Sequence, residues 1–472
     1  MTRVAAVDIG ATSGRVMTAE LDDAGIRLAE AARFPNRLVE ADGRWTWDID
    51  GLYGRVVDGL RAAGDVRSWG IDTWAVDYGV VRDGRRVGPV RAYRDPRHEG
   101  GMALVDAALP WPQQYGIAGI QRMPINTIYQ IAADEPVRLV DGATFLMVPD
   151  LLAWMATGAM AADVTNASST GMVDPRTRQW SPEVLTALGV PASAFLPLDE
   201  PGLIRGELRA AGAPALPLVG VATHDTASAF VGTPLADRDA ALVLSLGTWA
   251  LIGAETVGAV PTEASRALNV THELGIDATV RLLRNVCGMW LLEECRRAWA
   301  VDDGAETDVP SLLAAAAAAP SFAGILDVDA PSLAAPGQTP HGIAGHLDRP
   351  WDGARGSLVR AILESLVVRL MVRADEIESL LGTPRHTIHV VGGASRIGPL
   401  MQWLADATGR RVVAGPVEAT ALGNAIVQWR TLGTVGSVAE ARAVVAALPE
   451  ISTYEPIGSR DPWLAAAARL EG

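Results

Sequence analysis

The sequence predicts an α/β protein made of two similar domains. Up to residue 93, strand-length apolar runs alternate with a helical pattern in the order strand, helix, strand and hairpin. A strand–turn–strand unit with glycine and hydroxyl residues in its turn opens the chain, and a second unit of the same plan begins at Ala241. The two units do not align residue for residue, so the repeat is architectural. We therefore expect one domain over residues 1–236 and another over 237–472, near a linker at Thr233–Ala240.

The opening unit sets the plan of the chain. The apolar run Val4–Val7 predicts a strand that ends at Asp8, and Val16–Leu21 predicts the second strand. The turn between them contains small and hydroxyl-bearing residues: Gly10, Ala11, Thr12, Ser13 and Gly14. Such a turn is either an anion-binding nest for phosphate or an ordinary hairpin. Asp8 is likewise either a ligand for Mg²⁺ or merely the carboxylate at a strand end.

The sequence contains no lysine. This excludes the Walker P-loop and the protein-kinase ATP site, which both use a lysine, and it excludes a lysine Schiff base. Phosphate chemistry in this chain must therefore use backbone N–H groups, hydroxyl groups, Mg²⁺ and Arg15.

Composition excludes other classes of protein. The 472 residues are 49% hydrophobic and 20% charged, which is typical of a folded globular protein. The net charge of −15 and the absence of a basic cluster argue against nucleic-acid binding. No apolar run approaches the ~20 residues of a membrane span, and a predicted strand follows Met-Thr-Arg directly, so we expect no signal peptide and a cytoplasmic location. Cys287 and Cys295 are expected to be free thiols on one helix, and the seven histidines show no metal-ligand spacing.

Further elements of the first half follow from periodicity. We expect strands at Ile26–Arg33, Trp69–Thr73, Tyr78–Arg82 and Pro217–Ala222, and helices at Leu52–Ala63, Gln121–Gln130, Ala143–Met155 and Pro182–Leu188. Ser181 is a plausible cap for the last of these helices. The polar stretch Asp163–Thr170 predicts a loop.

The second half continues in the same way. After the Ala241–Glu255 unit, whose turn contains Gly247 and Thr248, we expect helices at Asn285–Trp299, Leu358–Leu381, Leu400–Ala407 and Thr420–Trp429, and strands at Thr387–Val391 and Arg411–Ala414. Gly392-Gly393 stands between a strand and the start of a helix. Such a glycine pair approaches a nucleotide or makes a close-packed turn, and both interpretations stand.

His224-Asp225 follows a buried-looking strand, in the loop position where α/β folds carry catalytic groups. A carboxylate there acts as general base toward a substrate hydroxyl, or it caps the helix that begins near Thr226. Asp72, like Asp8, has two interpretations. It binds Mg²⁺ or the sugar, or it is merely a carboxylate at the end of a strand. Trp74 either stacks on the face of a sugar or is a residue of the hydrophobic core. Asn285 is a donor to a sugar hydroxyl or the cap of the following helix.

Taken together, two glycine-hydroxyl turns, a third glycine turn and a carboxylate near the linker suit phosphoryl transfer from ATP. Closure of two domains would then exclude water, so that ATP is not hydrolysed.

A set of short segments stands in order over about 400 positions: Ala6–Met17, Gly70–Trp74 with Val76-Asp77, Ala92–Asp95, Asn126–Gln130, His224–Ala229, Gly247–Trp249, Leu283–Asn285, Trp290–Leu292, Val391–Gly393, and Ala414–Ala419 with Leu422–Asn424. In these residues the chain resembles the FGGY carbohydrate kinases and, among them, the rhamnulokinase group. The resemblance implies two actin-like, ribonuclease-H-like domains flanking a deep ATP/sugar cleft.

The resemblance also implies a reaction and its residues. The reaction is transfer of the ATP γ-phosphate to the 1-hydroxyl of L-rhamnulose, with ATP and Mg²⁺ as cofactors and a ketose sugar as partner. Asp225 matches the catalytic base of the family. Sugar contacts match His224, Thr226 and Asn285, and ATP contacts match Ala11, Thr12, Ser13, Gly14, Arg15, Thr248 and Gly393.

Three positions depart from the rhamnulokinase pattern. Ala75 replaces a glycine that touches the sugar, Glu293 replaces a glutamine that meets ATP, and Gly392-Gly393-Ala394 replaces a triple glycine. These departures bear on sugar choice more than on kinase activity. The alternatives are therefore a kinase for L-fuculose, xylulose or ribulose, or a non-catalytic ATP- and sugar-binding regulator of the same fold. The sequence indicates no oligomeric state.

Overall fold

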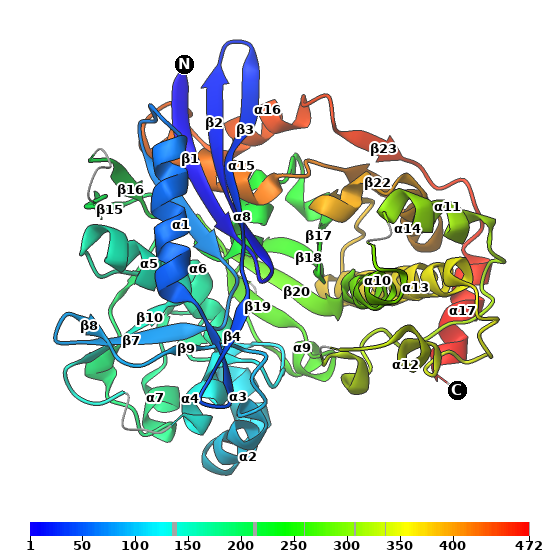
Figure 1. The fold of residues 1–472 in the computed structure, drawn as a ribbon, viewed down its shortest axis with the longest axis horizontal. Coiled ribbons are helices and arrows are strands. Elements are labelled where there is room, and N and C mark those ends of the chain that lie inside the picture. The colour runs from blue at the N-terminus through cyan, green and yellow to red at the C-terminus, as the bar shows by residue number, and fades with distance from the viewer. Residues whose placement is uncertain (135–138, 211–214, 259, 306–307, 336, 472) are drawn as a thin grey trace. The chain divides into compact units, whose positions relative to one another are not determined.

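The structure is a computed structural model that describes residues 1–471 except 135–138, 211–214, 259, 306–307 and 336 (Figure 1). It is a mixed α/β protein, as predicted, with one six-stranded sheet and one seven-stranded sheet as its main frameworks.

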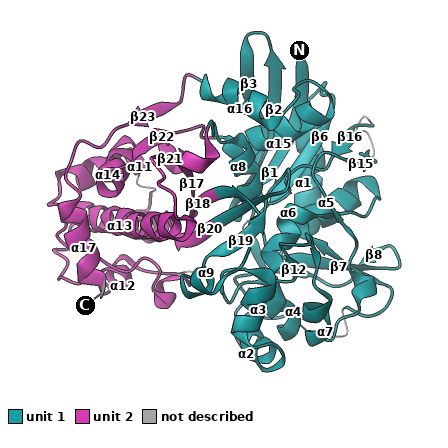
Figure 2. Ribbon diagram, turned by 180° about the vertical axis from the view of Figure 1, so that it is seen from behind, with its two compact units in different colours: residues 1–236, 255–282, 418–448 teal, residues 237–254, 283–417, 449–472 magenta. Residues whose placement is uncertain are grey.

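The chain forms two compact units, each assembled from separated stretches of sequence (Figure 2). Unit 1 contains residues 1–236, 255–282 and 418–448, and unit 2 contains 237–254, 283–417 and 449–472. The chain passes from one unit to the other between residues 236 and 237, where the domain boundary was expected. Because later segments return to unit 1, the assignment of two continuous domains stays a prediction.

The six-stranded sheet belongs to unit 1 and has the order β15-β16-β6-β1-β2-β3. Its strands are β1 (Thr2–Ile9), β2 (Ser13–Asp22), β3 (Gly25–Pro35), β6 (Trp69–Thr73), β15 (Ile204–Glu207) and β16 (Pro217–Val219). β1 pairs antiparallel with β2 and parallel with β6, and β16 is parallel to β6. The opening strand–turn–strand unit is thus confirmed as a hairpin.

Both faces of this sheet are covered, because alternate residues of a strand point to opposite faces. From β1, Ala5, Val7 and Ile9 join the core that contains the buried face of α1 (Ile49–Ala62). Val4 and Ala6 instead join the clusters that contain residues of α15 (Ala419–Thr431). A polar ladder also fixes α15: Ser68 donates to Gln428 at 2.7 Å, and Gln428 Nε2 donates to Asn424 at 2.7 Å and to the Ala5 carbonyl at 2.9 Å.

α15 crosses α8 (Asp225–Gly232) through two glycines, and both helices belong to unit 1. A Cβ added to Gly232 would lie 2.0 Å from the Ala419 carbonyl oxygen, and one added to Gly423 would lie 1.8 Å from the Ser228 carbonyl oxygen. The backbones of the two helices are therefore in direct contact, and only glycine fits at either position.

The other elements of unit 1 cover this framework or extend it. They include β4 (Leu38–Ala41), β5 (Arg44–Trp47), β7 (Tyr78–Arg82), β8 (Arg85–Arg86), β9 (Val90–Arg91), α2 (His98–Ala108), α3 (Trp111–Ala118), α4 (Thr127–Ala133), β10 (Ala143–Met147), α5 (Val148–Thr157), α6 (Val164–Ala167), α7 (Pro182–Ala187), α9 (Glu263–Ala267), β19 (Thr271–Leu274) and α16 (Val438–Ala446). The predicted Ser181 cap is confirmed, since its side chain accepts from the backbone N–H of Val184.

Three predictions in unit 1 were wrong in whole or in part. The expected helix Ala143–Met155 begins as β10, which pairs with β7, and only its second half is helical, as α5 with Pro149 in the first turn. The expected helix Gln121–Gln130 begins only at Thr127. The expected loop Asp163–Thr170 is the buried helix α6 followed by a 3-10 turn, because Asp163 caps it by accepting from the N–H groups of Thr165 and Asn166.

The seven-stranded sheet has the order β19-β20-β18-β17-β21-β22-β23. Its strands after β19 are β17 (Ala241–Leu246), β18 (Trp249–Val257), β20 (Thr279–Cys287), β21 (Thr387–Val391), β22 (Arg411–Ala414) and β23 (Ser452–Tyr454). The helices of unit 2 are α10 (Trp290–Asp303), α11 (Val309–Ala318), α12 (Pro340–Ala344), α13 (Arg355–Leu381), α14 (Gly398–Thr408) and α17 (Asp461–Glu471). The second strand–turn–strand unit is confirmed by the antiparallel pairing of β17 and β18.

The expected helix Asn285–Trp299 was wrong at its start. Asn285 and Cys287 lie on β20, and the helix begins at Trp290. Cys287 and Cys295 are both free, as expected, and burial raises the pKa of the Cys295 thiol to about 12. Within the described residues, no helix combines the length and the apolar character needed to cross a membrane.

Candidate active site

The carboxyl ends of three parallel strands bring the predicted polar residues of unit 1 to one edge of its sheet. Asp8 on β1 stands opposite Asp72 on β6 in the parallel register. Thr73, at the end of β6, forms a bridge with His224, and its N–H donates to the Thr223 carbonyl at 2.9 Å. In open α/β sheets this edge is where ligands bind.

Asp225 is the first residue of α8, and its contacts converge on one oxygen. Oδ1 accepts from the Thr226 N–H at 2.6 Å and from the Thr226 hydroxyl at 3.2 Å, and it lies 3.4 Å from His224 Nε2. The side chain remains 30% exposed. Burial raises the pKa of Asp225, His224 opposes the rise and Asp8 adds to it. Asp225 thus binds the helix N-terminus and also presents an accessible carboxylate.

Asp72 is a fully buried carboxylate. Its Oδ2 accepts from Asn424 Nδ2 at 2.7 Å, which joins it to the polar ladder of α15. Its Oδ1 has no hydrogen-bond partner in the described part of the chain. Burial raises the pKa of Asp72 well above its ordinary value, and the charge of Asp8 adds to the rise. An orphaned buried oxygen beside a second carboxylate suits a cation.

The predicted phosphate turn is held by a residue that the sequence pattern did not reveal. The Gly10 N–H donates to the Ser13 carbonyl at 2.9 Å and closes the turn. Asn36 is buried beside it, and it donates from Nδ2 to the Gly10 carbonyl at 2.9 Å and from its backbone N–H to the Thr12 carbonyl at 3.0 Å. Thr12 itself is exposed, so its hydroxyl is available to a ligand.

Gly14 has a packing role in the same turn. A Cβ at Gly14 would lie 2.2 Å from the Phe34 ring, so a larger residue would push that ring out of the core. Packing against Phe34 therefore explains why this position is a glycine.

Arg15 connects the hairpin to α15. Its Nη2 lies 2.7 Å from Asp8 Oδ2, and its Nη1 pairs with Glu418, which precedes the helix. Among the described residues, no group of three or more His, Cys, Asp or Glu side chains is arranged to hold a metal. Mg²⁺ needs fewer protein ligands, because it binds through one or two carboxylates together with substrate phosphates. Asp8, with Asp72 beside it, fits that requirement.

The loop after β6 is strained and tightly supported. Val76 has φ +68°, which is rare for a β-branched residue and costs roughly 1–3 kcal/mol. Its carbonyl accepts from Thr127 at 2.6 Å and from Gln130 at 3.1 Å. Asp77 accepts from the indoles of Trp47 and Trp74 at 2.6 and 2.9 Å. These contacts fix the backbone at Ala75.

Trp74 has the surroundings of a core residue. It is 5% exposed, and its ring centroid lies 4.4 Å from that of Trp47. Burial raises the pKa of Asp77 to about 6, and the two indole donors oppose the rise. Of the two interpretations of Trp74, the surroundings favour packing over stacking on a sugar.

In unit 2, the turn between β17 and β18 contacts the backbone of a glycine, Gly288. The Met289 N–H donates to the Gly247 carbonyl at 2.9 Å, and the Gly288 N–H donates to the Thr248 carbonyl at 3.2 Å. A Cβ at Gly288 would lie 2.6 Å from the Gly247 oxygen. Gly288 therefore permits this backbone contact, which sequence analysis did not anticipate.

The Gly392-Gly393 turn lies at the end of β21, which is parallel to β17. Gly392 has φ +92°, and a Cβ there would lie 2.9 Å from the Leu246 oxygen, so packing explains this glycine. Gly393 has nothing within 4 Å of an added Cβ, so its open surface is the part that suits a ligand.

Asn285 and Glu293 complete the candidates of unit 2. Asn285 is half-buried on β20, and the start of α10 at Trp290 removes its role as a helix cap. Glu293 lies in the first turn of α10 and pairs with Arg296 at 2.6 Å. This pairing offsets the charge that would repel phosphate.

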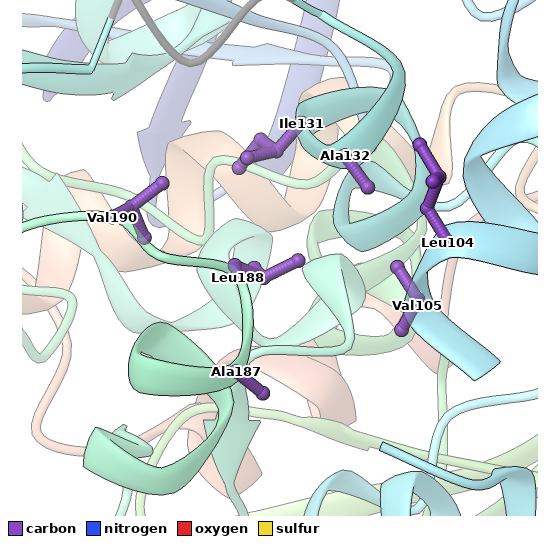
Figure 3. Close-up of a pocket in the computed structure, with 7 residues that line it drawn as sticks. All are labelled: Leu104, Val105, Ile131, Ala132, Ala187, Leu188 and Val190. Carbon is purple, nitrogen blue, oxygen red and sulfur yellow. The ribbon is translucent and has the colours of Figure 1, made fainter. Parts of the chain in front are cut away.

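A cavity elsewhere in unit 1 contains none of these residues. Figure 3 shows the side chains that line this apolar cavity: Leu104, Val105, Ile131, Ala132, Ala187, Leu188 and Val190. The cavity lies by α2, α4 and α7 and has a volume of about 130 Å³. Its lining offers no polar side chain to a sugar or a phosphate, so it is not a candidate active site.

The fold is the actin-like, ribonuclease-H-like fold with two domains, and the family match that follows makes the chain an ATP-dependent carbohydrate kinase. The chain belongs to the FGGY family of carbohydrate kinases: the N-terminal domain model of that family matches residues 4–232, and the C-terminal domain model matches residues 242–432.

Among curated proteins, the chain is 37% identical to a rhamnulokinase of Bacteroides thetaiotaomicron, covering 96% of this chain and 95% of that protein. It is 36% identical to a rhamnulokinase of Klebsiella pneumoniae, covering 96% and 94%.

Solved structures agree on the fold. A ligand-bound xylulose kinase from Lactobacillus acidophilus has a TM-score of 0.81 at 15% identity, covering 99% of this chain and 96% of that one. A glycerol kinase from Plasmodium falciparum with ADP has a TM-score of 0.78 at 15% identity, covering 99% and 97%.

Proposed function

We propose that this kinase transfers the γ-phosphate of ATP to the 1-hydroxyl of L-rhamnulose, with Asp225 as the general base. The observation that carries the proposal is the accessible Asp225 carboxylate at the ligand-binding edge of the unit 1 sheet. The choice of sugar is supported by curated rhamnulokinases that match the chain over nearly its whole length.

The proposed reaction uses the two oxygens of Asp225 differently. Oδ1 is occupied by the donors of Thr226, which leaves Oδ2 to accept the proton of the sugar hydroxyl. As that proton leaves, the sugar oxygen bonds to the γ-phosphorus, the bond from this phosphorus to the β–γ bridging oxygen breaks, and ADP departs. A pKa raised by burial makes the carboxylate a stronger base than a free aspartate.

We assign the phosphates of ATP to residues other than lysine, which the chain does not contain. We assign the hairpin residues Ala11 to Arg15 to ATP in unit 1, and Gly247, Thr248, Glu293 and Gly393 to ATP in unit 2. Asp8 would hold Mg²⁺, and Asp72 lies beside it. When bound, Mg²⁺ offsets the negative charge of the phosphates.

His224, Thr226 and Asn285 are assigned to the sugar, and Ala75 to the wall of its site. Because Ala75 stands where the rhamnulokinase pattern has glycine, a kinase for L-fuculose, xylulose or ribulose is the second candidate. The support around Val76 makes this wall rigid, so one methyl group there affects which sugar fits.

The test is ATP-dependent release of ADP with L-rhamnulose, L-fuculose, xylulose, ribulose and glycerol, followed by NMR of the phosphorylated product. We expect the highest kcat/KM with L-rhamnulose and a phosphate on its O1. Turnover of another sugar without turnover of L-rhamnulose would move the assignment to that sugar. Phosphate on another oxygen of L-rhamnulose would contradict the proposed orientation.

A further inference from the structure

Behind His224 lies a buried charged pair that the proposed reaction has not used. Glu273 on β19 and Arg281 on β20 lie in unit 1, and their Oε2 and Nη1 atoms are 3.2 Å apart. Arg281 is fully buried, and Glu273 and His224 are each 5% exposed. Burial alone would raise the pKa of Glu273, but the positive charge of Arg281 opposes this effect and the pKa is lowered. The pair is therefore ionised.

The guanidinium of Arg281 lies within hydrogen-bond distance of one nitrogen of the His224 ring. Its Nη1 and Nη2 both lie 3.3 Å from Nδ1. Nη2 also donates to the carbonyls of Thr165 and Leu274, at 3.3 and 3.2 Å, which fixes the plane of the guanidinium. A guanidinium has donors and no acceptor, so its hydrogen bond to Nδ1 requires that this nitrogen carries no proton.

The other ring nitrogen leads to the same tautomer. His224 Nε2 lies 3.4 Å from Asp225 Oδ1. This contact is longer than a hydrogen bond, but a proton on Nε2 is attracted by the carboxylate, whereas a bare Nε2 would point a lone pair at it. Glu273 Oε2 lies close to Nδ1 but has no hydrogen-bond partner among the described residues, so Nδ1 does not donate to it. The hydrogen bond from Arg281 to Nδ1 therefore places the proton of the neutral ring on Nε2. Glu273 lies 3.2 Å from Nδ1 and 3.2 Å from Arg281 Nη1, so its main effect is to balance the charge of the arginine.

We infer that Arg281, held by Glu273, is a positioning residue that fixes the tautomer and orientation of His224, so that its Nε2–H faces Asp225 Oδ1 and the site, and Asp225 Oδ2 is left for the substrate. Arg281 acts only through His224 and touches no substrate. This inference rests on the proposed role of Asp225, although the tautomer of His224 can be measured without sugar or ATP. Outer partners that orient a metal-binding histidine typically contribute about 10–100-fold to affinity or activity, and we expect an effect of the same size from a partner that orients His224.

The first test is long-range ¹H–¹⁵N NMR of histidine-labelled protein without ligands, at a pH where the imidazoles are neutral. The His224 signal is assigned by its loss in His224→Gln. We expect an Nε2–H tautomer in the wild type and a mixture of tautomers in Arg281→Met. An Nδ1–H tautomer in the wild type would overturn the inference, whatever sugar the enzyme uses.

The second test compares kinetics in the full-length protein. Arg281→Met should lower kcat by about 10–100-fold with the sugar KM changed by less than about threefold. Arg281→Lys keeps a cationic donor and should recover most of kcat. Because Arg281→Met leaves Glu273 as an unpaired buried charge, the double variant Glu273→Leu/Arg281→Met removes both charges. It should fold and still have a low kcat, and a wild-type kcat in this variant would overturn the inference.

A matched control is Arg360→Met in unit 2. Arg360 pairs with the buried Glu364 at 2.8 Å, so its loss also leaves a buried carboxylate without its partner. Within the described part of the chain, the hydrogen bonds and the ion pair of Arg360 are all made with residues of unit 2. We expect the wild-type kcat per folded molecule in this variant, and a loss equal to that of Arg281→Met would reduce the effect to general destabilisation and overturn the inference.

Discussion

At the scale of single residues, the two oxygens of Asp225 have different roles in the proposed reaction. Oδ1 is held by the start of α8, and Oδ2 is assigned to the proton of the sugar hydroxyl. We expect Asp225→Asn to lower kcat by about 10²–10⁴-fold, the usual contribution of a positioned base. The amide keeps an oxygen for the Thr226 N–H, so the sugar KM should change little. Steady-state kinetics check this, and an unchanged kcat would remove Asp225 from the role of base.

The same carboxylate predicts a pH dependence whose sign follows from its protonation. Only the ionised form accepts a proton, so kcat/KM should rise with pH until Asp225 is deprotonated. Because burial raises the pKa of Asp225, this rise should be centred above the pKa of a free aspartate. The residual kcat/KM of Asp225→Asn should not show this rise with pH. A profile of the variant with the same acid limb as the wild type would assign that limb to another group.

Ala75 predicts a change in specificity from one methyl group. Ala75→Gly would enlarge the proposed sugar site, while Thr127 and Gln130 keep the adjacent Val76 carbonyl in place. We expect kcat/KM for six-carbon L-rhamnulose to rise by up to about tenfold relative to five-carbon ribulose, in line with the ~1–3 kcal/mol attached to a methylene in a pocket. An unchanged ratio would show that Ala75 does not contact the sugar.

Residue patterns revealed the groups that stand at strand ends and missed those that support them. Asp8, Asp72 and Asp225 were candidates because each ends or follows an apolar run. Asn36, Glu273 and Arg281 gave no local signal, because each acts on a turn or a side chain that is distant in the sequence. Only the pairing of strands brings such partners together.

At the scale of elements, the opening hairpin predicts an effect on ATP. Asn36→Ala removes the hydrogen bond to the Gly10 carbonyl, worth about 1 kcal/mol. We expect the KM for ATP to rise about three- to tenfold with a small change in the sugar KM. Thr46→Val is the control, since it removes a comparable side-chain bond to a carbonyl, that of Val39, in the same unit. Equal effects of both variants would argue against a special role for the hairpin.

Errors in predicting elements have a common physical origin. The run Ala143–Met155 is apolar almost throughout, and periodicity alone does not divide it into β10 and α5. Asp163–Thr170 is polar in sequence but buried, because its side chains are satisfied within the protein. Asp163 Oδ1, for example, accepts from the Thr223 N–H at 3.2 Å and from the Thr223 hydroxyl at 3.0 Å. Asn285 was placed on a helix because its strand leads into one after two residues.

At the scale of the whole molecule, unit 1 needs residues far beyond its first 236. From α15, Leu422, Ile426, Val427 and Trp429 are fully buried, each contributing roughly 1.5–3 kcal/mol to the core. A fragment of residues 1–236 also leaves Asp72 without Asn424. We expect it to be insoluble or to lack a cooperative thermal transition, as judged by circular dichroism against the full chain. A soluble, cooperatively folding fragment would support a continuous domain over residues 1–236.

The crossing of α8 and α15 at Gly232 and Gly423 has a consequence for motion. Because their backbones touch with no side chain between them, we expect the two helices to move as one rigid body. Asp225 begins one of these helices, and Glu418, which pairs with Arg15 of the opening hairpin, precedes the other. The proposed base and the opening hairpin should therefore be displaced together, so that their separation stays constant while the chain around them fluctuates.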